Sequence, residues 1–137
     1  AFALRRGVPW VATNMDATFP TPRGLAPGNG SLVMAVAHAT GRQPDAVAGK
    51  PERSLFDEAV ARTGATRGLM VGDRLDTDIA GGNRAGMETL LVLTGVCSAD
   101  EAAKADGDEI PTYVGDDLRS LLTEPVRWGE MRGGSHA

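Results

Sequence analysis

Three side chains suited to phosphate and metal chemistry follow short apolar runs in the middle of the chain. Lys50 follows residues 46–48, Asp73 follows residues 68–71, and Asp78 comes five residues after Asp73. A hard cation such as Mg²⁺ takes oxygen ligands from one or two carboxylates and leaves room for water and phosphate oxygens. A lysine ammonium is a compact charge that binds phosphate. The pattern therefore indicates a site for Mg²⁺ and phosphate that contains Lys50, Asp73 and Asp78.

The elements that must position these side chains alternate between strand and helix. In chain order, the apolar periodicity and the helix-end residues predict strand 46–48, helix 54–62, strand 68–71, helix 78–85, strand 89–93 and helix 98–105. Such alternation predicts a parallel sheet covered on both faces, in which ligands bind beyond the carboxyl ends of the strands. Lys50 and Asp73 are therefore expected on the same rim of the sheet.

The flanking segments are more irregular. Residues 8–13 read as a buried strand, and the Pro- and Gly-rich segment 19–30 as a loop or hairpin. Ser31 is expected to cap a helix over residues 32–39 that ends at Gly41. Towards the C-terminus we expect an edge strand at 111–114, a helix at 116–122 and a disordered tail from Glu130.

The composition excludes several classes of function. The net charge is −4, with 14 Lys and Arg against 18 Asp and Glu, so no nucleic-acid partner is expected. No apolar run approaches the roughly 20 residues of a membrane span, so no membrane partner is expected. The one cysteine, Cys97, forbids an internal disulfide and suits a reducing, cytoplasmic location.

Four motifs in order resemble one known family. They are Gly49-Lys50-Pro51, Gly72-Asp73 with Asp78, the run 81–87 and the run 91–96. Together they resemble the haloacid dehalogenase-like phosphatases, and most closely the class IIA branch, which includes phosphatases of phosphoglycolate, pyridoxal phosphate and glycerol 3-phosphate. The resemblance runs from about Trp10 to Leu122.

The resemblance implies an α/β fold in two parts. Residues 1–45 would be the C-terminal end of an α/β cap domain, which selects the substrate. Residues 46–137 would be the second half of a Rossmann-like parallel-sheet core, the phosphatase core domain.

The resemblance also implies a Mg²⁺-dependent phosphatase that hydrolyses a small phosphomonoester through an aspartyl-phosphate. Asp73 would be a direct Mg²⁺ ligand, and Asp78 would hold metal-bound water as a catalytic residue. Lys50 would be catalytic and bind the phosphate of the substrate. The substrate-binding loop of the cap would include three further residues, Asn14, Asp16 and Phe19.

The sequence departs from the family at the nucleophile, which should be the first residue of an Asp-x-Asp pair after a buried strand. Asp76 and Asp78 already belong to the metal motif, and Asp106 and Asp108 follow a polar, helical segment. We therefore expect the nucleophile in an N-terminal half that is missing here, so that this chain is a fragment, inactive alone. Its expected partners are a small phosphorylated metabolite and either a second copy in a homodimer or the missing N-terminal half.

Two other functions remain open on the sequence alone. The chain could be a catalytically inactive interaction module that binds metal or an anion, or a phosphomutase-type relative. Asp73 could instead lie at an exposed helix N-terminus, and Asn14 and Asp16 are ordinary turn formers. Asp76 could cap the helix after it or lie near the metal, and capping or exposure is favoured.

Other reactive residue types receive structural roles. Residues 27–30 lack the Lys-Ser/Thr that follows a phosphate-binding P-loop, so we reject that assignment. His38 and His136 have no partner at ligand spacing, and Cys97 is expected to act as a small apolar residue.

Overall fold

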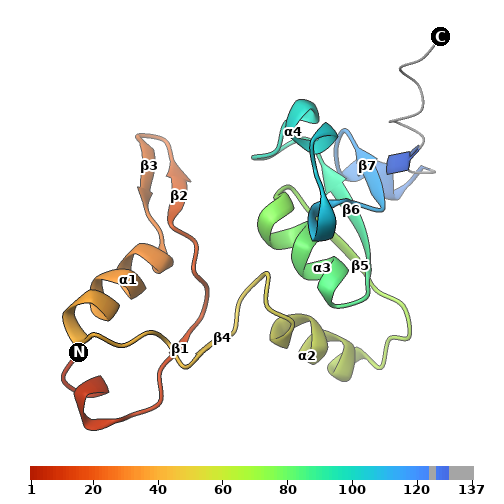
Figure 1. Ribbon diagram of the computed structural model, residues 1–137. Coiled ribbons are helices and arrows are strands. Elements are labelled where there is room, and N and C mark those ends of the chain that lie inside the picture. Colours follow the sequence, from red (N-terminus) through yellow and green to blue (C-terminus); the bar gives the residue numbers. More distant parts are fainter. Residues whose placement is uncertain (124–125, 130–137) are drawn as a thin grey trace. The chain divides into compact units, whose positions relative to one another are not determined.

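A computed structural model describes residues 1–123 and 126–129 of the chain (Figure 1). The residues fall into two compact units, Ala1–Glu52 and Arg53–Ala137, and each is described by itself. Strands and helices are mixed in both units, so the expected α/β class is confirmed. The tail predicted from Glu130 onward lies outside the described residues.

The first unit contains a short parallel strand pair, an antiparallel hairpin and a helix. β1 (Val11–Ala12) pairs in parallel with β4 (Ala46–Val47), and β2 (Thr18–Thr21) pairs antiparallel with β3 (Gly24–Pro27). The hairpin occupies most of the segment predicted as a loop or hairpin. The unit also contains α1 (Asn29–Thr40) and the single turn η1 (Leu4–Arg6).

The start of α1 corrects the expected helix cap. Gly28, not Ser31, is the N-cap, and the Ser31 hydroxyl lies inside the helix and donates to the Ala17 carbonyl at 2.6 Å. The Gly28 amide donates to the same Ala17 carbonyl at 2.8 Å, so a carbonyl of the preceding loop, rather than a serine side chain, organises this end. The predicted end is confirmed, because Gly41 adopts a φ of +69° and donates to the Ala37 carbonyl.

The second unit is built on a sheet in the order β5-β6-β7-β8. β5 (Leu69–Gly72), β6 (Glu88–Val92) and β7 (Tyr113–Gly115) are parallel, whereas β8 (Val126–Arg127) runs antiparallel to β7. The predicted parallel sheet is therefore confirmed for residues 68–71 and 89–93. The predicted strand 46–48 is β4, which pairs with β1 in a separate two-stranded sheet of the first unit, so the expectation that Lys50 and Asp73 end strands of one sheet is wrong. The expectation that residues 111–114 form an edge strand is wrong, because β8 pairs with the far side of β7.

One helix precedes these strands, and other helical segments connect them. In chain order they are α2 (Ser54–Thr63), the π-helical turn η2 (Leu75–Ile79), α3 (Ala80–Arg84), α4 (Ala99–Ala103) and the 3₁₀ turns η3 (Gly107–Glu109) and η4 (Leu118–Leu121). The helix expected at 78–85 thus begins earlier, in η2. The helix expected at 116–122 is only the turn η4, where the Asp117 carboxylate accepts from the Arg119 amide at 2.7 Å.

The core of the second unit lies between the sheet and the segments after β5 and β6. The buried residues that pack together there are Ile79, Leu91, Cys97, Ala102, Val114 and Trp128. The expected inner face of α2 is only partly correct: Phe56 is buried, whereas Leu55, Ala59 and Val60 are exposed. Among the described residues, no helix is both long and apolar enough to cross a membrane.

Candidate metal and phosphate site

The ends of β5 and β6 place two loops at one edge of the sheet. The strands are parallel, with Gly72 opposite Leu91, so the segments that follow them leave the sheet at the same rim. Asp73 is the first residue after β5, and Gly95 and Val96 follow β6 within a few residues. This is the rim where ligands of parallel α/β sheets bind.

Asp73 is held by the loop after β6. Its Oδ2 atom accepts a hydrogen bond from the Val96 amide at 2.8 Å, and its carbonyl accepts from the Cys97 amide at 3.1 Å. The side chain is half-buried. Its Oδ1 atom accepts no hydrogen bond from any described residue, which leaves one carboxylate oxygen able to bind a cation or water.

Asp78 is buried and closes the turn after β5. The residue is only 3% exposed. Its Oδ2 atom accepts hydrogen bonds from the amides of Asp73 at 3.1 Å and Arg74 at 3.2 Å. In return, the Arg74 carbonyl accepts from the amides of Asp78 and Ile79, both at 3.1 Å. Asp78 therefore holds the backbone that carries Asp73, and its expected contact with metal-bound water stays a prediction.

Two glycines make room for these carboxylates. A Cβ atom on Gly72 would lie 2.3 Å from the Asp78 carboxyl group, and one on Gly95 would lie 2.0 Å from Asp73 Oδ2. Real Cβ atoms do not approach other atoms so closely. Any larger residue at either position would displace the carboxylate beside it.

Asp76 forms an ion pair with its neighbour Arg74. It accepts from Arg74 Nη2 at 2.7 Å and from Arg74 Nε at 3.0 Å, and its side chain is largely exposed. The Arg74 guanidinium is the main cause that lowers the pKa of the Asp76 carboxyl group. The cap assignment is wrong, since no side chain caps the start of η2, and the expected exposure is confirmed.

Lys50 lies in the first unit, in a turn that the Glu52 amide closes on the Gly49 carbonyl at 3.0 Å. The turn packs against the loop after β1, because a Cβ atom on Gly49 would lie 2.2 Å from the Thr13 carbonyl oxygen and 2.9 Å from Asn14 Cβ. The first unit thus brings the Lys50 turn beside Asn14.

The other predicted substrate residues follow in the same unit. The Asn14 side chain accepts from the Asp16 amide at 3.2 Å, which is an Asx turn. Phe19 lies on β2 opposite Ala26 and is 52% exposed. An exposed phenylalanine of this size is available to a ligand or to another surface.

The described residues that were given structural roles keep them, and His136 lies outside the described part of the chain. The amides of Gly28 and Gly30 donate to the carbonyls of Ala17 and Asp16, both at 2.8 Å, so they do not cradle a phosphate. His38 is exposed on α1. Cys97 is buried in the core, and burial first, then the Glu101 carboxylate, raises the pKa of its thiol.

The carboxylates of the second unit fit a hard, hydrated cation. Within residues 1–123 and 126–129, no three His, Cys, Asp or Glu side chains lie close enough together to enclose a metal ion. Asp73 nevertheless offers one unshared carboxylate oxygen beside a carboxylate that holds its loop. Mg²⁺ keeps several waters and often takes only one or two protein carboxylates, so this donor set suits Mg²⁺ better than a metal that needs a closed cage.

The sequence analysis included residues 91–96 among the family motifs but gave Gly95 and Val96 no role in this site. Gly95 and Val96 act through a missing side chain and a backbone amide, which motifs of reactive side chains do not reveal. The available signal was their position, since they follow a buried strand that neighbours the strand of Asp73.

A family model supports the family resemblance that the motifs predicted. The model described as HAD-hydrolase-like, where HAD stands for haloacid dehalogenase, matches residues 47–121. The matched region contains Lys50, Asp73 and Asp78, and it covers more than half of the chain.

Curated relatives are phosphatases of the same family. The chain is 58% identical over 121 residues to the D-glycerol 3-phosphate phosphatase of Mycobacterium tuberculosis. The matched region covers 88% of this chain and 34% of that relative. The chain is 45% identical over 122 residues to the 5'-nucleotidase YutF of Bacillus subtilis, covering 88% of this chain and 46% of that protein. The chain therefore spans between a third and a half of the length of these relatives.

Solved structures of phosphatases also match this chain. A glycerol phosphate phosphatase from Mycobacterium tuberculosis in complex with magnesium matches with a TM-score of 0.82 at 57% identity, over 88% of this chain and 36% of that one. A 4-nitrophenylphosphatase from Thermotoga maritima matches with a TM-score of 0.81 at 37% identity, over 88% of this chain and 46% of that one.

Proposed function

This chain belongs to the haloacid dehalogenase-like hydrolase family, and we propose that it supplies the metal-binding and phosphate-binding part of a Mg²⁺-dependent phosphatase. The observation that carries the proposal is the Asp73 carboxylate, with one oxygen bound to the loop after β6 and the other left without a hydrogen bond from the described residues. The magnesium complex of the 57% identical glycerol phosphate phosphatase supports the choice of metal.

Each site residue has a distinct task in this proposal. Asp73 binds Mg²⁺ directly through its available oxygen. Asp78 holds the backbone of Asp73 and Arg74 through its buried carboxylate and thereby keeps the ligand in place. Lys50 binds the phosphate oxygens of the substrate, and its positive charge offsets theirs. Bound Mg²⁺ would supply further charge neutralisation, which is the main requirement of phosphoryl transfer.

The proposed substrate is a small phosphomonoester, and a glycerol phosphate is the first one to test. The name of the 58% identical relative supports that choice. We assign the recognition of its non-phosphate part to the loop that contains Asn14, Asp16 and Phe19. The packing of the Lys50 turn against Asn14 supports this, because the two segments lie in contact within one unit.

The remaining catalytic groups are proposed to lie outside these 137 residues. The nucleophilic aspartate, which would form the aspartyl-phosphate, has no candidate here, and the relatives are two to three times as long as the matched region. In this assignment residues 1–45 end the cap domain and residues 46–137 form the second half of the core. The chain alone is then inactive and needs the nucleophile-bearing half.

The test is release of inorganic phosphate from D-glycerol 3-phosphate by the complete gene product. We expect release that requires Mg²⁺, stops with a chelator and falls strongly in Lys50→Ala. The matched control is Lys104→Ala, since Lys104 is exposed and is the other lysine of the sequence.

Different outcomes identify the alternative functions. Mg²⁺ binding without phosphate release from any phosphomonoester would indicate an inactive metal-binding module. Conversion of one sugar phosphate into its isomer, with no free phosphate, would indicate a phosphomutase.

A further inference from the structure

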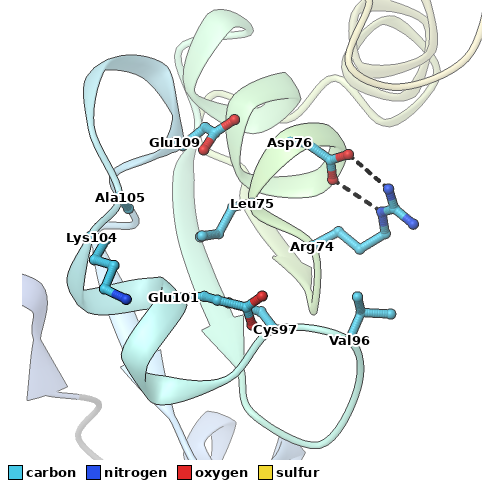
Figure 2. Close-up of a pocket in the computed structure, with 9 residues that line it drawn as sticks. All are labelled: Arg74, Leu75, Asp76, Val96, Cys97, Glu101, Lys104, Ala105 and Glu109. Atoms are coloured by element: carbon cyan, nitrogen blue, oxygen red, sulfur yellow. Dashed lines mark hydrogen bonds and ion pairs between the residues drawn. The ribbon is translucent and has the colours of Figure 1, made fainter.

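The segment Gly95-Val96 touches the Asp73 side chain with its backbone only. The Val96 amide donates to Asp73 Oδ2 at 2.8 Å. Val96 is 62% exposed and lines a surface cavity of about 390 Å³ together with Arg74, Leu75 and Cys97 (Figure 2). What position 96 contributes to the carboxylate is therefore its N–H group and not its side chain.

Gly95 sets how closely the segment approaches. A Cβ atom here would lie 2.0 Å from Asp73 Oδ2 and 2.4 Å from its Cγ. The backbone of Gly95 does not adopt a positive φ, so the need for glycine comes from space and not from backbone conformation. With any other residue, either the carboxylate or the segment would have to move.

We infer that Gly95 and the Val96 amide are positioning elements that fix the rotation of the Asp73 carboxylate, so that Oδ2 faces the loop and Oδ1 faces the cation. This inference rests on the proposed function, because it assigns a role in binding Mg²⁺. It adds two requirements for metal binding beyond the charged residues of the motif. These are a glycine and an N–H group in the loop after the neighbouring strand. One carboxylate oxygen held by an N–H group leaves the other for monodentate binding, and such supporting hydrogen bonds typically change metal affinity about 10–100-fold.

The experiment is calorimetric titration of MgCl₂ into the complete gene product, with two pairs of matched variants. Gly95→Ala introduces the clashing Cβ, and Gly129→Ala adds a Cβ where no atom lies within 4 Å. Val96→Pro removes the N–H group, and Val96→Ala keeps it while shortening the side chain. We expect Gly95→Ala and Val96→Pro to weaken Mg²⁺ binding by about tenfold or more, and both controls to bind as the wild type does.

The outcomes separate this inference from the proposed function. If Asp73→Asn loses Mg²⁺ binding while Gly95→Ala and Val96→Pro keep it, the inference is wrong and the proposed metal ligand stands. If Asp73→Asn binds Mg²⁺ as the wild type does, the proposed metal role fails, and the inference fails with it.

A second measurement does not depend on the folding of the variants at positions 95 and 96. Hydrogen exchange of the Val96 amide should be slow in the wild-type protein although the residue is exposed, and it should accelerate in Asp73→Ala. An amide that exchanges equally fast in both proteins would overturn the inference.

Discussion

Asp73 and Asp78 are chemically identical, and their surroundings give them different tasks. Asp78 is 3% exposed, and its Oδ2 atom accepts two backbone N–H groups. Asp73 is half-buried and has a carboxylate oxygen that no described residue engages. The motif spacing singled out both residues. It could not predict the side-chain contact of Asp73, because this depends on the backbone of Gly95 and Val96, which follows a different strand of the sheet.

The buried contacts of Asp78 predict an effect on stability. Asp78→Ala leaves the amides of Asp73 and Arg74 without their acceptor, and we expect the free energy of unfolding to fall by about 2 kcal/mol or more. The matched control is Asp76→Ala, which removes an exposed ion pair with Arg74 and should cost less than about 1 kcal/mol. Urea unfolding of the two variants measures both values, and equal losses would contradict the positioning role of Asp78.

The single thiol predicts a dependence on pH. Burial, and then the Glu101 carboxylate, raise the pKa of Cys97 in the folded protein. Because the thiolate is the reactive form, alkylation of the native protein by iodoacetamide should require a higher pH than alkylation of the unfolded chain. The unfolded chain also loses this proton first, so the contribution of Cys97 to stability is present below its unfolded pKa and is lost as the pH rises through its folded pKa. Native and unfolded protein with the same pH profile of alkylation would contradict the assignment of Cys97 to the core.

At the scale of elements, apolar runs predicted two strands of the sheet, whereas only some of the capping patterns were correct. Residues 68–71 and 89–93 were predicted as strands and overlap β5 and β6, and the capping box of Ser98 and Glu101 opens α4 as expected. The errors lie where a contact distant in sequence decides. Gly28 replaces Ser31 as a cap because the 16–17 loop supplies acceptors, and β7 is internal because β8 returns to pair with it. Local sequence patterns do not predict such contacts.

The capping box of α4 gives the prediction that belongs to this scale. The Ser98 hydroxyl accepts from the Glu101 amide at 3.3 Å, and Glu101 Oε2 accepts from the Ser98 amide at 2.8 Å. Ser98→Ala should lower the free energy of unfolding by about 1 kcal/mol, and Ser98→Thr, which can still cap, should lower it less. Thermal unfolding of both variants tests this, and an Ala variant as stable as the wild type would show that the box contributes nothing.

At the scale of the whole molecule, the sequence predicted the α/β class, the parallel sheet and the family. It did so because Gly49-Lys50-Pro51, the Asp73 motif and the strand at 89–93 occur in one order with consistent spacing. The choice of substrate was beyond it, since Asn14, Asp16 and Phe19 lie in a loop of ordinary turn formers. The chain also spans only 34% to 46% of the relatives compared, so the activity, the metal ligand and the phosphate-binding lysine are proposals about a longer protein.

The most direct measurement of that claim is the Mg²⁺-dependent hydrolysis of D-glycerol 3-phosphate by the complete gene product carrying Asp73→Asn. The substitution keeps the size and the hydrogen-bond acceptor of the side chain but removes its charge, so we expect hydrolysis to be lost at every Mg²⁺ concentration while the fold is retained. Asp57→Asn, on the exposed surface of α2, should hydrolyse the substrate as the wild type does. Full Mg²⁺-dependent activity in Asp73→Asn would contradict the assignment of Asp73 as the metal ligand, and with it the central claim.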